Sequence, residues 1–288
     1  MLSFLPPLRI HVWGGLGSQL FGVSVAHDLS NRFRGRKITL VLHTSGVTHR
    51  VPEVISLFPA FQYELRDDYL GEKFSENSSG PGVRDSFRAL LKKTMRVLFF
   101  LQTANDDDEF SRVKMWTLSI RGHYSYRSIT HEFYSLLEKS IRKVKGIDPV
   151  DQKSTCVIHY RLGDLLDLQE KNPIPVEMIF DELEKSRHKL FFTNVVIFSD
   201  SPKVALERFS KFGTEKVSAP EANTFEVMAN SIRAGYFIGT SSKISFWIAG
   251  LRASIFESSS SLPISNDREY RNMLHRATNC VTGYPREM

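Results

Sequence analysis

The 288-residue sequence predicts an α/β fold made of two Rossmann-type halves. In the second half, short apolar runs rich in β-branched residues alternate with longer amphipathic segments, which is the pattern of strand-helix units in a parallel sheet. In the first half, an apolar strand runs into a glycine-rich turn and then a helix. Because the chain is longer than a typical single domain, we expect two domains, residues 1–148 and 149–288, with the last helix able to pack back on the first.

The composition narrows the class of protein. Hydrophobic residues at 41% and charged residues at 24% are typical of a soluble globular protein and exclude a fibrous or disordered one. A formal charge of +6 favours an anionic partner, namely a nucleotide phosphate, a nucleic acid or an acidic membrane face. The two cysteines, Cys156 and Cys280, give neither a disulfide framework nor a zinc spacing. With no secretory signal and no long apolar run, we predict a cytoplasmic protein.

The first strand-helix unit contains the glycine-rich turn. Residues 9–13 read as a strand, and apolar residues at helical spacing predict a helix over 18–33. The glycines between them, Gly14, Gly15 and Gly17, permit a positive φ and a close backbone approach to a ligand. The full dinucleotide pattern is absent, since neither a further spaced glycine nor an acidic ribose partner follows. Two interpretations of this turn therefore remain: a loop that faces a ligand, and a tight connection between a strand and a helix.

The rest of the first half contains one segment with a distinctive pattern. A strand is expected over 37–42, a short helix over 53–58 and a loop over 77–82. Over 84–99 basic residues recur every four positions beside an apolar side, at Arg84, Arg88, Lys92 and Arg96. A helix of this kind can lie on an anionic membrane, or it can be a domain helix with a solvated basic face.

Three consecutive aspartates at 106–108 invite a metal-site interpretation, but no apolar strand leads into them. We predict a solvated acidic loop and no metal site. A strand over 115–121, a polar loop over 122–127 and a helix over 129–144 follow, and the turn at 146–149 is the expected domain boundary.

We expect the candidate catalytic site at residues 155–164. The β-branched run at 155–158 predicts a buried strand, so His159 and Arg161 emerge at its carboxyl end, where open α/β sheets bind ligands. Gly163 permits a tight turn, and Asp164 can cap the next helix or fix the Arg161 guanidinium. A cation held beside a helix start suits a diphosphate. The alternative is a surface Arg-Asp pair after an ordinary core strand.

Strand-helix units continue to residue 256. We expect helices over 175–190, 202–212, 224–234 and 242–251, and strands over 194–198, near 216, over 236–239 and over 253–256. Asp200 follows one strand and can bind a base or ribose, or act as a helix N-cap. Residues 239–242 follow another strand, and their hydroxyl and N–H groups can bind an anion or merely cap the helix.

Four motifs together carry a family resemblance. GGLGSQLF at 14–21 and HYRLGD at 159–164 resemble signatures of bacterial alpha-1,2-fucosyltransferases, and SSKISFW at 241–247 is similar to a third. The segment GHYSY at 122–126 resembles a fourth less closely. The order and spacing match over most of the chain.

The resemblance implies a GT-B fold, in which two Rossmann-type domains face a central cleft, the first on the acceptor side and the second binding the nucleotide sugar. It implies an inverting transfer of fucose from GDP-fucose to the 2-hydroxyl of a sugar acceptor, with no metal and no other cofactor. The acceptor would be an oligosaccharide or a lipid-linked glycan in the assembly of a bacterial surface polysaccharide of O-antigen type. A cytoplasmic enzyme peripheral to the inner membrane fits this role, and no nucleic-acid partner is expected.

The resemblance also assigns roles to residues. Arg161 would hold the diphosphate and, with Asp164, is the catalytic candidate. The other donor-binding residues would be Gly14, Gly15, Gly17, Gln19, His159, Asp200, Ser241, Ser242 and Ser245. The general base stays unassigned, with His11 and Asp28 as candidates. Leu162 replaces a second arginine of the motif, and Lys243 or Arg252 would supply the missing charge.

Two other functions remain open. The first is a glycosyltransferase of the same fold that uses a different nucleotide sugar. The second is a nucleotide-binding or nucleic-acid-binding module without catalysis, although basic residues are not interleaved with aromatics in one stretch and no nucleic-acid motif is present.

Overall fold

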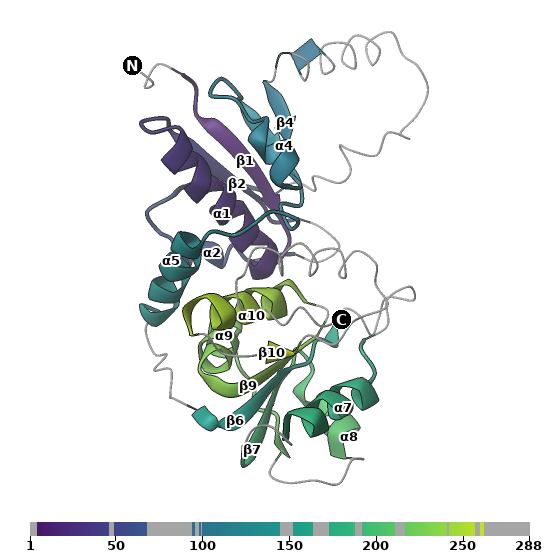
Figure 1. Cartoon of the computed structure of the whole chain (residues 1–288). Helices are drawn as coiled ribbons and strands as arrows, with labels where there is room; N and C mark the ends of the chain where they lie inside the picture. Colours follow the sequence, from purple (N-terminus) through teal and green to yellow (C-terminus); the bar gives the residue numbers. More distant parts are fainter. Residues whose placement is uncertain are drawn as a thin grey trace. The chain divides into compact units, whose positions relative to one another are not determined.

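A computed structural model describes residues 5–45, 49–67, 94–95, 98, 100–144, 152–163, 173–187, 192–210, 217–240, 242–256 and 260–261. Contacts divide the chain into two compact units, Met1–Ser128 and Ile129–Met288. Each unit contains one five-stranded sheet in which all pairings are parallel (Figure 1). The predicted α/β class with parallel sheets is confirmed.

The sheet of the first unit has the strand order β3-β2-β1-β5-β4. The chain adds strands outward from β1 on one side and then returns to place β5 on its other side. Parallel sheets bind ligands where such a reversal occurs, so β1 and β5 mark this position. The strands are β1 (Leu8–Trp13), β2 (Ile38–His43), β3 (Gln62–Arg66), β4 (Leu101–Thr103) and β5 (Ser119–Arg121).

Helix α1 (Leu16–Arg32) packs closely on this sheet because a glycine lies at the contact. A Cβ atom on Gly22 would lie 2.2 Å from Cγ2 of Val12 in β1, which is too close for any real contact. Gly22 therefore permits the close packing of helix α1 on the sheet. The short helices α2 (Val54–Leu57) and α4 (Asp107–Ser111) complete the described helices of the unit.

The sheet of the second unit has the strand order β10-β9-β6-β7-β8. Counted from β6, this is the 3-2-1-4-5 order of a Rossmann half, and its reversal lies between β6 and β9. The strands are β6 (Gln152–His159), β7 (Asn194–Phe198), β8 (Val217–Ser218), β9 (Ala234–Gly239) and β10 (Ser260–Ser261).

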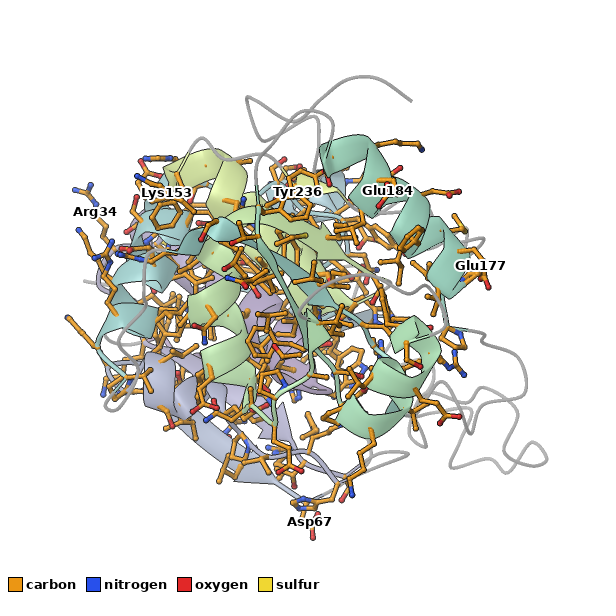
Figure 2. All side chains as sticks on the ribbon, turned by 90° about the horizontal axis from the view of Figure 1, so that it is seen from below. Arg34, Asp67, Lys153, Glu177, Glu184 and Tyr236 are labelled. Atoms are coloured by element: carbon orange, nitrogen blue, oxygen red, sulfur yellow. The ribbon has the colours of Figure 1, made fainter. Side chains whose placement is uncertain are left out.

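Helices cover both faces of the second sheet (Figure 1). One face packs on α7 (Val176–Arg187) and α8 (Pro202–Ser210), through a core in which Cys156 and Ile158 meet Ile179. Helix α7 directs Glu177 and Glu184 to its outer side (Figure 2), so its apolar stripe faces the sheet. The other face carries α9 (Thr224–Ile232) and α10 (Lys243–Ile255).

Helix α5 (His131–Arg142) belongs to the second compact unit. Its Phe133 and Tyr134 rings lie 5.7 and 5.9 Å from the Trp247 ring of α10, and a Cβ atom on Gly250 would meet the Tyr134 hydroxyl at 2.2 Å. This packing places the contact division before α5, whereas the sequence placed the domain boundary after it, at 148/149. Residues 145–150 lie outside the described part, and the roles assigned to the two domains stay predictions.

Several sequence-based elements need correction. The predicted strand over 253–256 is wrong, because α10 continues to Ile255 and Phe256 is its C-cap. The predicted acidic loop is also wrong, because Asp107 and Asp108 lie in α4 and the Asp106 side chain caps this helix by accepting the Glu109 N–H at 2.9 Å; Asp107 and Asp108 are exposed as predicted. The strand expected over 115–121 is shorter and comprises only β5. Strands β3, β4 and β10 were not predicted.

No helix within the described residues is long and apolar enough to cross a bilayer. The proposed membrane-facing segment 84–99 lies outside the described residues, apart from Thr94, Met95 and Leu98.

Candidate functional site

The strand ends at the reversal in the second unit bring polar groups together. Strands β6 and β9 pair in register up to His159 and Gly239, so the residues that follow both strands begin at the same edge. Within the described residues these are Tyr160 to Gly163 on one side and Thr240 and Ser242 on the other. This is the edge at which the sequence placed the chemistry.

Thr240 ties the two strand ends together. Its Oγ1 donates a hydrogen bond to the His159 carbonyl at 2.9 Å and accepts one from the Arg161 N–H at 3.0 Å. The Thr240 side chain is buried, so both bonds are shielded from water. The backbone from which the Arg161 side chain projects is therefore fixed to the loop before α10. From the sequence, Thr240 was expected only as one of several hydroxyl groups in the loop over 239–242.

The partly buried His159 and the buried Ser245 form a polar pair at this edge. The Nδ1 atom of His159 lies 2.8 Å from Ser245 Oγ, which also accepts the Thr240 N–H at 3.1 Å. The pKa of His159 is lowered to about 4, chiefly by burial; the Asp200 carboxylate opposes this effect and the Arg161 cation adds a smaller lowering. The imidazole is neutral at pH 7, and we assign Ser245 as the donor to Nδ1.

Asp200 holds the turn after Arg161. Its Oδ1 accepts the N–H groups of Leu162 and Gly163, each at 2.8 Å. A Cβ atom on Gly163 would lie 2.2 Å from Asp200 Oδ2, so glycine is required for this approach. The carboxylate positions the Arg161 turn, and the predicted contact with a nucleoside stays a prediction.

The start of α10 has a simple cap in addition to any role with a ligand. Ser242 is the N-cap, and its hydroxyl accepts the Ile244 N–H at 3.2 Å. The remaining N–H groups of the first turn give this end a partial positive charge beside the Arg161 loop. Ser241 and Asp164, the other two candidates here, lie outside the described residues.

The structure changes the interpretation of Leu162 and Arg252, the two residues considered with the positive charge beside Arg161. Leu162 is fully buried in the core between β6 and α7, so its position in the motif faces the interior here. Arg252 is also fully buried, and its guanidinium donates to Ser260 Oγ at 3.0 Å and to backbone carbonyls at the end of α9. The suggestion that Arg252 supplies a donor-binding charge is therefore wrong, which leaves Lys243, the first residue of α10.

In the first unit, the glycine turn follows β1 as predicted. Gly14 has a φ of 92°, in the left-handed region that favours glycine, and Gly15 is the N-cap of α1 with no side-chain cap. The buried Gln19 donates from Nε2 to the carbonyls of Gly14 and Val51, and its Oε1 accepts the Val54 N–H. These bonds assign Gln19 to positioning the turn instead of contacting a donor. The predicted role of Gly17 stays a prediction.

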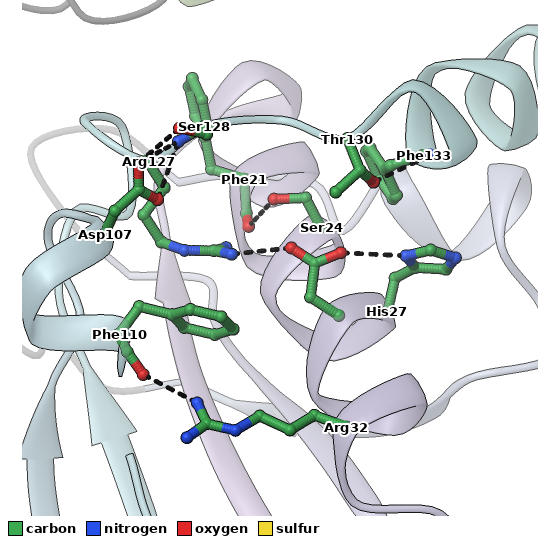
Figure 3. Close-up of polar contacts among 11 residues, drawn as sticks. Phe21, Ser24, His27, Arg32, Asp107, Phe110, Arg127, Ser128, Thr130 and Phe133 are labelled. Atoms are coloured by element: carbon green, nitrogen blue, oxygen red, sulfur yellow. Dashed lines mark hydrogen bonds and ion pairs between the residues drawn. The ribbon is translucent and has the colours of Figure 1, made fainter. Parts of the chain in front are cut away.

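The two candidates for the general base are both engaged inside the first unit. The Asp28 carboxylate lies between the His27 ring, at 3.2 Å, and the Arg127 guanidinium, at 2.7 Å (Figure 3). The Arg127 side chain is 2% exposed and stacks 3.6 Å from the centre of the Phe110 ring. This buried ion pair makes Asp28 a structural residue.

His11 is buried against His43, with Nδ1 of the first 2.9 Å from Nε2 of the second. Burial lowers the pKa of His11 to about 3, and Arg121 adds to this effect. The ring is neutral at pH 7, but it is 4% exposed and already bonded. Neither candidate for the general base is supported.

The comparisons with known proteins are weak. No protein-family model matches the sequence. No curated protein matches it.

Similar solved structures include the NodZ alpha-1,6-fucosyltransferase soaked with GDP-fucose, with 14% identity, a TM-score of 0.43 and coverage of 85% of this chain and 92% of that one. POFUT1 in complex with GDP-fucose has 12% identity and a TM-score of 0.43, over 91% and 99% of the two chains. A family 9 glycosyl transferase from Veillonella parvula DSM 2008 has 11% identity and a TM-score of 0.43, over 98% and 94%. The proposals below rest on the residues of this chain.

Proposed function

We propose that the chain is a glycosyltransferase that transfers fucose from GDP-fucose to the 2-hydroxyl of a sugar acceptor, with inversion. The donor diphosphate binds at the β6 and β9 ends, between Arg161 and the start of α10. The resemblance of the motifs at 14–21, 159–164 and 241–247 is the support for fucose as the sugar and guanine as the nucleobase of the donor. The arrangement of groups at the strand ends is the support for the diphosphate site.

The observation that carries the proposal is the fixation of Arg161 from both sides. Thr240 holds its backbone N–H, and Asp200 holds the next two N–H groups. A guanidinium carried on a backbone fixed in this way, together with the helix start at the same sheet edge, can stabilise negative charge with little reorganisation during the reaction. Diphosphate charge increases as the glycosidic bond breaks, so this is the group that such a site favours in the transition state.

A different nucleotide sugar is the second candidate, and the buried Leu162 favours it. The motif of the resembling family has an arginine at this position, whereas Leu162 belongs to the core. Isothermal titration of the protein with GDP, UDP and ADP separates the two candidates. Preference for GDP supports GDP-fucose, and preference for UDP would exclude it. GDP binding without turnover across a panel of acceptors would favour a non-catalytic module.

We propose that no divalent metal takes part, because Arg161 and the α10 start can neutralise the leaving diphosphate. The titrations and turnover assays are therefore made in excess EDTA. Full activity is the expected result, and loss restored by Mn²⁺ would contradict the proposal.

The acceptor is proposed to be an oligosaccharide or a lipid-linked glycan of a bacterial surface polysaccharide, and the enzyme is proposed to act in the cytoplasm at the inner membrane. Residues 84–99 would provide the membrane contact. Each basic residue near an anionic surface contributes about 1 kcal/mol, so binding to vesicles should weaken with salt. Equal sedimentation with neutral and anionic vesicles at low salt would remove this part of the proposal.

A further inference from the structure

A second aromatic and polar arrangement lies at the reversal of the first sheet. Strand β1 ends at Trp13 and β5 ends at Arg121. The two strands pair Ile10 with Ile120, and this register, continued beyond the end of β5, places Trp13 level with His123. The two rings are in edge-to-face contact, with centres 5.4 Å apart and an angle of 64° between their planes. His123 is exposed and Trp13 is partly exposed.

The loop that carries His123 is held in an unusual conformation. Tyr124 has a φ of 56°, the left-handed region that a bulky residue rarely adopts. Its ring is 1% exposed, and its hydroxyl lies 2.7 Å from the His11 carbonyl and 3.1 Å from the Ile120 carbonyl. The hydroxyl thus anchors the strained residue to both β1 and β5.

The residue before His123 is fixed as well. Gly122 lies so close to Asn105 that a Cβ atom on it would be 2.9 Å from Asn105 Oδ1, and this same oxygen accepts the His123 N–H at 2.8 Å. The Asn105 bond and the two contacts of the buried Tyr124 hydroxyl therefore hold the backbone on both sides of the exposed His123. Strain of this kind persists where the surroundings over-determine it, and such places are commonly functional.

The groups beside Trp13 and His123 are polar. Trp13 is followed directly by the glycine turn and by the amino end of α1, which has no side-chain cap among the described residues. An imidazole can bond hydroxyl groups, and an aromatic ring can pack against C–H groups. A pyranose has both features, since one face of its ring is formed by C–H groups and its rim carries hydroxyls.

We propose that Trp13 and His123 form a sugar-binding platform that takes the acceptor glycan. The indole packs against the C–H face of one pyranose, and His123 bonds a hydroxyl on its rim. This inference rests on the proposed function for the identity of the sugar as an acceptor, but the platform itself consists of residues in the first unit.

The chain provides a matched control. Trp116 is 46% exposed and lies just before β5, at the amino end of the same sheet, whereas Trp13 lies at the carboxyl end. Removal of Trp116 therefore deletes an exposed indole from the same unit without touching the platform. Trp13→Phe retains an aromatic face and guards against a folding defect in Trp13→Ala.

The experiment is saturation-transfer difference NMR on the full chain without donor. The probes are methyl β-D-galactoside, methyl α-D-glucoside, methyl α-D-mannoside and methyl β-D-N-acetylglucosaminide. We expect transfer to at least one glycoside in the wild type and in Trp116→Ala. We expect a loss of about fivefold or more in Trp13→Ala and in His123→Ala, with partial retention in Trp13→Phe.

Three outcomes would overturn the platform: no transfer to any glycoside, equal transfer in Trp13→Ala and the wild type, or equal loss in Trp116→Ala. Titration with GDP in parallel separates this failure from that of the proposed function. Glycoside binding that depends on Trp13 in a protein that does not bind GDP would keep the platform and refute the donor. GDP binding in a protein whose glycoside binding does not depend on Trp13 would support the donor and refute the platform.

Discussion

The Oδ1 atom of Asp200 lies 2.8 Å from the backbone nitrogen of Gly163 and accepts its N–H. The same atom accepts the Leu162 N–H, so one carboxylate oxygen holds the turn that directly follows Arg161. We therefore assign this carboxylate to positioning Arg161.

Removal of this acceptor should weaken donor binding. Asp200→Ala deletes two charge-assisted hydrogen bonds, and we expect the Kd for GDP to rise about tenfold because the Arg161 turn is no longer fixed. Asp200→Asn retains an oxygen acceptor and should lose much less. Isothermal titration measures both, with Asp181→Ala, at an exposed position of α7, as the control. If Asp200→Asn lost as much as Asp200→Ala, the negative charge itself would matter, and the carboxylate would contact the donor.

The packing of α1 on β1 should not tolerate a methyl group at position 22. Because the Cβ of Gly22→Ala would lie 2.2 Å from Val12 Cγ2, we expect the free energy of unfolding to fall by about 1–3 kcal/mol. Urea denaturation measures the change. Asn31→Ala, at an exposed position of the same helix, is the control.

A double variant tests the cause of that loss. Val12→Ala removes the clashing methyl groups, so it should be less harmful in the Gly22→Ala background than alone. Additive effects of the two substitutions would show that the contact is not the source of the loss.

The buried His11 should make the protein less stable in acid. The pKa of His11 is about 3 in the folded chain and near 6.5 when unfolded, so only the unfolded state takes up this proton as the pH falls below 6.5. Stability is therefore full above pH 6.5 and is lost progressively toward pH 3. Between pH 7 and 5 the loss from this residue is about 2 kcal/mol.

The contribution of His11 is isolated by difference, because His159, with a pKa of about 4, acts in the same direction. The fall in unfolding free energy between pH 7 and 5 should be smaller in His11→Gln than in the wild type. His49→Gln, which removes an exposed imidazole, should leave the fall unchanged. An identical fall in all three proteins would show that His11 titrates normally.

Much of the fold follows from local sequence pattern. The strands at the centres of the sheets, such as β1 and β6, are apolar and β-branched because both of their faces are buried, and they were predicted. The missed strands lie at or next to sheet edges. β3 has the sequence QYELR and β10 is two serines, so their pairing is determined by the neighbouring strand and not by their own pattern.

The candidate site was also predicted only where a local sequence pattern indicates it. The emergence of His159 and Arg161 at a strand end follows from where the apolar run stops. The use of Arg252 could not be read from the sequence, because its partners are carbonyl groups brought near by tertiary packing. The engagement of Asp28 by Arg127 likewise joins residues that are far apart in the chain, so charge alone suggested a base where the structure has an ion pair.

The central claim is that Arg161 binds the donor diphosphate, and the most direct measurement compares GDP affinity and turnover of Arg161→Ala with the wild type. The contact strengthens as the bond to the sugar breaks, so we predict that both fall, turnover by about 10²-fold or more. Arg161→Lys should restore only part, because an ammonium cannot make a two-pronged contact. Arg34→Ala, which removes an exposed arginine of the first unit (Figure 2), should have no effect. Wild-type affinity and turnover in a folded Arg161→Ala protein would contradict the account.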